Sequence, residues 1–149
     1  MTGRAARLTL GLVVLAAALA GVFTSCPTYR DGVPGRLASA EQQTESAAHS
    51  AALALHLWQQ GRSPDRLAAV QISDARDDVA ESYDTTAVLR TTDPVDLAGQ
   101  TLLMQIMTEI ISTLNRSYAA VRAGPQHEST ADLRAALIAA ADDLRRRYR

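Results

Sequence analysis

Apolar residues recur every three or four positions in four successive stretches of the chain, and this spacing is typical of amphipathic helices. The predicted helices cover about residues 37–60, 64–90, 94–123 and 130–147. Each apolar face includes several larger side chains, among them Leu37, Leu55 and Trp58 in the first, Ile72, Val79 and Tyr83 in the second, Leu97, Leu103 and Ile110 in the third, and Leu133, Leu137 and Leu144 in the fourth. The third stretch is apolar along two stripes, which predicts a central helix that contacts two neighbours.

Turn and capping residues separate these stretches. Gly61 and Gly124 are typical helix stops, whereas Ser63 and Asp93 each precede a proline, as N-cap residues often do. The short connections favour antiparallel neighbours, and no stretch alternates between apolar and polar residues as a half-buried strand would. The predicted class is therefore all-α. An apolar signal or anchor helix precedes an up-down antiparallel bundle of three long helices, and a fourth, C-terminal amphipathic helix either closes the bundle or projects from it.

The first 26 residues have a different pattern. Arg4 and Arg7 precede an uncharged, mostly apolar run over residues 8–23, and small residues follow at positions 24–26. A basic start, an apolar run and small residues together are typical of a secretory signal segment. The following residues 27–36 are rich in proline and glycine and are interpreted as a tether to the domain at residues 37–149.

Residues 23–26, "FTSC", contain the only cysteine and resemble the lipobox of bacterial lipoproteins. This resemblance implies that the signal is cut before Cys26, that the Cys26 thiol is diacylated and that the new amino terminus is acylated. An uncleaved single-span anchor and conventional cleavage within residues 16–21 remain alternatives. The positive-inside rule places the remainder outside the cytoplasm, on the extracytoplasmic face of the cell membrane. If residues 8–23 formed a buried core helix instead, the basic residues Arg4 and Arg7 before it would have no explanation.

Composition limits the possible functions. Hydrophobic residues make up 47% of the chain but aromatic residues only 4%, and the abundance of alanine predicts a thin, closely packed core. All 15 basic residues are arginine, which is associated with GC-rich bacterial genomes. The net charge of −1 gives no support to nucleic-acid binding, which requires a basic surface. A single cysteine excludes an internal disulfide and a cysteine-based zinc site.

Two groups of residues were considered as metal ligands. Four carboxylates of the second predicted helix share a face and could offer oxygen ligands to a divalent cation, although a solvated face is the preferred interpretation: Asp74, Asp77, Asp78 and Glu81. The histidines His49 and His56 lie two helical turns apart, too far for shared coordination, and His127 lies in a turn. No metal site, cofactor or catalytic residue is therefore predicted.

The C-terminal sequence "DDLRRRYR" is the remaining candidate interaction surface. Its arginines could contact anionic lipid headgroups, and the alternative is that they complement the dipole of the last helix: Arg145, Arg146, Arg147 and Arg149. Under the second interpretation, Arg146 pairs with Asp142 four residues earlier.

Three functions are compatible with this sequence. The leading hypothesis is a membrane-tethered helical protein of the bacterial cell envelope that acts without catalysis, through an envelope protein, through self-association or as a structural part. A bundle that binds a ligand in an apolar cavity near Met104 and Met107 is the second. A metal-dependent enzyme that uses the carboxylates of the second helix is the third.

Overall fold

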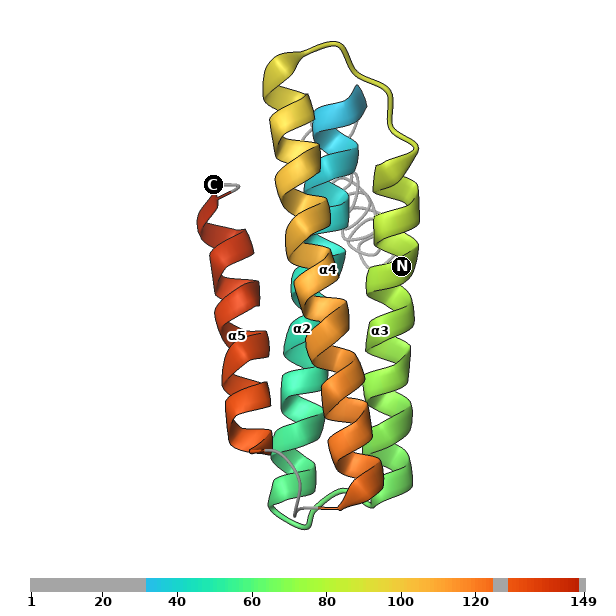
Figure 1. The fold of residues 1–149 in the computed structure, drawn as a ribbon, viewed down its shortest axis with the longest axis vertical. Helices are drawn as coiled ribbons and strands as arrows, with labels where there is room; N and C mark the ends of the chain where they lie inside the picture. Colours follow the sequence, from blue (N-terminus) through green and yellow to red (C-terminus); the bar gives the residue numbers. More distant parts are fainter. Residues whose placement is uncertain (1–31, 125–128, 148–149) are drawn as a thin grey trace, which may run out of the picture.

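The computed structural model describes residues 32–124 and 129–147, which form four α-helices and no strand (Figure 1). The helices are α2 (Gly32–Gln59), α3 (Asp65–Ala87), α4 (Pro94–Ala123) and α5 (Thr130–Arg147). The predicted all-α class and helical bundle are confirmed. The predicted signal or anchor segment, with Cys26, lies outside the described residues, as do His127 and Arg149.

The helices run alternately up and down, and α5 packs along the bundle instead of projecting from it (Figure 1). Helices α2 and α4 contact each other and both of the other helices, so α3 and α5 lie on opposite sides of this pair. Helix α4 is central, as its two apolar stripes predict. Helix α2 is equally central, because its alanines allow close approach by three neighbours.

The predicted cap is present at the start of α4 but not at the start of α3. There, Pro64 is the N-cap residue, and the Ser63 hydroxyl has no hydrogen-bond partner from the part of the chain that the structure describes. Asp93 caps α4, since its Oδ1 accepts hydrogen bonds from the backbone N–H of Val95 at 2.7 Å and of Asp96 at 3.4 Å. Helix α2 begins at Gly32, five residues before the predicted start, and so includes half of the expected tether. Pro34 is compatible with this start, because the N–H groups of a first helical turn have no partner within the helix.

Helix α3 ends at Ala87, three residues before the predicted end, and residues 88–93 connect it to α4. Gln100 of α4 stabilises this exit. Its Nε2 donates to the carbonyl oxygens of Thr86 at 2.7 Å and of Leu89 at 3.4 Å. The neighbouring helix thus supplies partners to carbonyl groups that a longer α3 would have paired internally.

Two hydrogen bonds identify the side of α2 that faces α3. Gln43 Oε1 accepts from Ser82 Oγ at 3.1 Å, and Trp58 Nε1 donates to Asp65 Oδ1 at 2.7 Å. Positions 43, 47, 51, 54 and 58 follow one another at helical spacing. The three that lie between the two bonds are buried alanines, which we call the alanine row: Ala47, Ala51 and Ala54. Small side chains at this interface permit the two helices to approach closely.

A second side of α2 faces α5. Gln59 Nε2 donates to Thr130 Oγ1 at 2.7 Å, and Arg145 Nε donates to Glu45 Oε1 at 2.7 Å. Between these two contacts, α2 carries the buried alanines Ala48 and Ala52 at helical spacing. Helix α5 supplies larger buried side chains to the core, namely Leu133, Leu137 and Leu144. The interface therefore combines small residues on α2 with leucines on α5.

Candidate functional site

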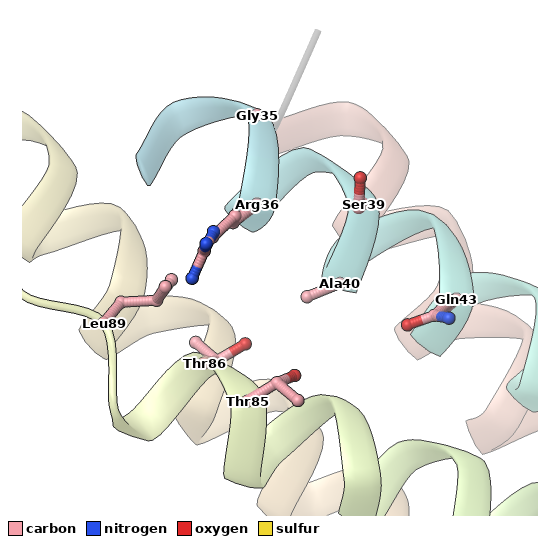
Figure 2. Close-up of a pocket in the computed structure, with 8 residues that line it drawn as sticks. All are labelled: Gly35, Arg36, Ser39, Ala40, Gln43, Thr85, Thr86 and Leu89. Carbon is pink, nitrogen blue, oxygen red and sulfur yellow. The ribbon is translucent and has the colours of Figure 1, made fainter. Parts of the chain in front are cut away.

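A hollow of about 300 Å³ lies between the first turns of α2 and the last turns of α3 (Figure 2). Figure 2 shows Arg36 extending from α2 toward Leu89, with the threonines of α3 on the opposite wall. The lining residues are Gly35, Arg36, Ser39, Ala40, Gln43, Thr85, Thr86 and Leu89. This volume is at the lower end of the range for small-molecule pockets, and polar and apolar atoms share the lining about equally, whereas such pockets are mainly apolar.

Two polar side chains of this hollow have hydrogen-bond partners within the bundle. Thr85 Oγ1 donates to the carbonyl oxygen of Ser82 at 3.0 Å, and Gln43 accepts from the hydroxyl of Ser82. The Oγ1 of Thr86 has no hydrogen-bond partner among the described residues, but this oxygen is itself shielded from solvent. Because the lining contains no carboxylate, imidazole or thiol, the hollow can offer hydrogen bonds to a polar group but no general acid or base.

The carboxylates of α3 lie where a solvated face is expected. Asp74, Asp77, Asp78 and Glu81 are exposed, and Arg76 Nη2 pairs with Asp77 Oδ1 at 2.8 Å. Within the described ranges, no group of three or more His, Cys, Asp or Glu side chains is placed to hold a metal ion. Asp78 and Glu81 line a second hollow together with Gln43 and Ser50 of α2, and no histidine, cysteine or carboxylate of α2 lines it.

The two described histidines have separate neighbours. His49 Nε2 lies 3.8 Å from Glu45 Oε1, and His56 Nε2 lies 3.1 Å from Gln60 Nε2. Glu41 lies one turn before Glu45 on α2. Partial burial raises the pKa of the Glu41 carboxyl, and the negative charge of Glu45 raises it further. Glu45 also pairs with Arg145 of α5, so an ion pair joins this side of α2 to the last helix.

The described C-terminal arginines all contact carboxylates of the bundle. Arg145 pairs with Glu45 of α2, and this bond raises the pKa of Arg145. Arg147 Nε lies 2.6 Å from Asp143 Oδ2, and Arg146 Nη2 lies 3.5 Å from Asp143 Oδ1. The predicted pair of Arg146 with Asp142 is therefore wrong, because the carboxylate three residues before Arg146 serves both arginines.

Met104 and Met107 do not lie together on an open groove. Met107 is fully buried in the core, and Met104 is partly buried. The hollow described above is lined by residues of α2, of α3 and by Leu89, and includes no residue of α4. The apolar cavity expected beside these methionines is therefore not this hollow.

Three large apolar side chains are exposed around the α3–α4 connection, and the sequence analysis missed them as a group. Val88, Val95 and Leu97 are exposed to 69%, 78% and 53%, respectively. Leu97 was expected on the buried face of its helix. It is exposed because α3 has already ended at Ala87, so no helix covers this side of the first turn of α4. We call these three residues the end patch.

No protein-family model matches this chain, and comparisons with curated proteins and with solved structures also found no match. None of the helices α2 to α5 contains a stretch that is long and apolar enough to cross a membrane.

Proposed function

We propose that this chain is a membrane-tethered, extracytoplasmic helical domain of the bacterial cell envelope, and that it acts without catalysis by binding another envelope protein. One observation carries the proposal. A basic start, an apolar run and the lipobox-like "FTSC" end only six positions before α2 begins at Gly32. A signal or anchor segment is thus joined almost directly to a folded domain.

The charge and the chemistry of the bundle support a binding role. The hollow between α2 and α3 offers hydrogen bonds but no acid–base pair, and the α3 carboxylates are solvated. The arginines at the end of α5 are paired with carboxylates within the bundle, so their charge is largely balanced in place. We therefore attribute the membrane association to the N-terminal segment and not to the C-terminal arginines.

The tether is tested by mass spectrometry of the chain extracted from the membranes of a bacterial host. A diacylglyceryl group on an amino-terminal Cys26 is the expected result, and the variant Cys26→Ala should lose both the lipid and the cleavage. The variant Ser50→Ala is a matched control, since Ser50 is an exposed residue of α2. If the Cys26→Ala variant instead keeps Met1 and stays in the membrane, the tether is an uncleaved anchor and not a lipid.

Recovery of the native chain in the aqueous fraction, without lipid and without detergent, would overturn the tether itself. The binding role has a separate test. Crosslinking in intact cells should join the bundle reproducibly to one other envelope protein. Crosslinking only between copies of this chain would assign it self-association instead.

A further inference from the structure

The end patch lies at the same end of the bundle as the start of α2. Figure 1 shows the α3–α4 connection and the first turn of α2 at the top of the view, with the 60–64 turn at the opposite end. The hollow between α2 and α3 confirms this neighbourhood, because Arg36 of α2 and Leu89 of the connection line it together. The first turn of α2 and the α3–α4 connection therefore lie at the same end of the bundle.

The end patch is unusual among the apolar residues of the bundle. Six large hydrophobic side chains are exposed in the described parts of the chain, and three of them form this patch. Val95 and Leu97 belong to the first turn of α4, and Val88 follows the last residue of α3. Val95 and Leu97 lie two positions apart on α4 and point to different sides of it, so what the three residues share is their place at one end of the bundle. Exposed apolar side chains concentrated at one end of a domain often mark a contact with a protein or a membrane.

The covalent length of the chain decides between these two partners. Six peptide units join Cys26 to Gly32, and an extended chain gains at most about 3.6 Å per residue, so the span is at most about 22 Å. A lipid on Cys26, or an anchor that ends there, holds the start of α2 within that distance of the bilayer surface. The end patch at the same end of the bundle is then within reach of the headgroups.

We propose that the end patch is a lipid-contact surface, and that Val88, Val95 and Leu97 enter the boundary between headgroups and acyl chains. This inference rests on the proposed tether. It explains why three large apolar side chains are exposed at this end of the bundle, one directly after α3 and two in the first turn of α4. It also fixes the orientation of the domain, with the 60–64 turn pointing away from the membrane.

The charges of this end favour apolar insertion over attraction to anionic lipid. Arg36 and Arg90 are exposed, and Asp93 and Asp96 belong to the same end of the bundle. The Asp93 carboxylate caps α4, and Asp96 Oδ2 accepts from Thr91 Oγ1 at 3.4 Å. Two positive and two negative side chains leave the end near neutrality, so we expect the contact to depend little on salt or on the fraction of anionic lipid.

Tryptophan fluorescence in vesicles with brominated acyl chains tests the contact. The full chain, extracted from host membranes, is reconstituted into phosphatidylethanolamine and phosphatidylglycerol vesicles with or without bromine. The only native tryptophan, Trp58, lies next to the distant turn and reports on that end. The variant Val95→Trp places a second tryptophan in the end patch. The variant Leu67→Trp is the matched control, because Leu67 is also exposed but lies at the far end.

The added fluorescence of Val95→Trp should be quenched by the brominated lipid, whereas the native chain and Leu67→Trp should give the same emission in both kinds of vesicle. Circular dichroism confirms that both variants keep the helical fold. Equal emission of Val95→Trp in both vesicles, with the chain still floating with them, would overturn the lipid contact. The same result is expected if a second copy or another part of the chain covers the end patch, and it would overturn the lipid contact in that case too. Failure of the chain to reach the membrane fraction would instead overturn the proposed tether.

Discussion

The packing of α2 against α3 depends on the small size of the alanine row, and the substitution Ala51→Leu tests this. Ala51 is completely buried between Ala47 and Ala54, on the side of α2 that the bonds to Ser82 and Asp65 turn toward α3. Leucine has nearly the same helix propensity as alanine, so the backbone preference changes by only a few tenths of a kcal/mol. Its three additional carbon atoms have no space unless the helices separate.

Additional carbon atoms in a closely packed core typically cost about 1–3 kcal/mol of unfolding free energy. For a domain of this size, 1 kcal/mol corresponds to a shift of roughly 4 °C in Tm, so Ala51→Leu should lower Tm by about 4–12 °C. The assay is thermal unfolding of the full chain in a mild detergent, followed by far-ultraviolet circular dichroism. A chemical denaturation curve under the same conditions gives the unfolding free energy independently.

Ala38→Leu is the matched control, since Ala38 lies on the same helix but is exposed. Its effect should stay within about 0.5 kcal/mol, as for most surface substitutions. Equal Tm values for Ala51→Leu and Ala38→Leu would refute the reasoning, because they would show that the alanine row has room for larger side chains.

Two further predictions concern polar groups. Gln100→Leu removes the side-chain donor to the carbonyl oxygens of Thr86 and Leu89. It should lower the unfolding free energy, measured by urea denaturation, by about 1–3 kcal/mol. An unchanged urea midpoint would contradict this role of Gln100. Burial, and next the charge of Glu45, raises the pKa of Glu41 above 4.5, so the folded state holds this proton over a pH range in which the unfolded chain has lost it. Stability therefore falls as pH rises through that range. Glu41→Gln should raise the urea midpoint at neutral pH and leave it unchanged well below pH 4.5, and an equal gain at both would point to a cause other than the charge.

The sequence predicted those parts of the fold that are determined by residues close together along the chain. The bounds of α4 and α5 agree with the prediction, because Asp93 with Pro94, Gly124 and Ser129 specify the ends of these helices through their own backbone chemistry. The apolar period likewise identified Leu55 and Ile72 as buried residues. Pro34 favours a tether by composition, but a first helical turn accommodates proline, and α2 includes it.

Contacts between distant segments were beyond the reach of these signals. Periodicity assigned Leu97 to an apolar face, but it does not tell whether a neighbouring helix extends far enough to cover that face. The pair Glu45–Arg145 joins residues 100 positions apart and has no local signature. The choice of Arg146 between Asp142 and Asp143 likewise depends on how α5 lies on the bundle. The exposure of the end patch could therefore be recognised only from the structure, which shows where α3 ends and α4 begins.

The distribution of small and large side chains between α2 and α5 has a consequence for how the chain folds. Synthesis proceeds from the N-terminus, so α2, α3 and α4 are complete before α5, and the side of α2 that α5 covers stays open until the last helix arrives. That side presents Ala48 and Ala52, and the leucines that complete the interface belong to the helix that is made last. A chain that still lacks α5 consequently exposes little apolar surface on this side of α2. The alanines that make the finished core thin also protect the unfinished domain from aggregation.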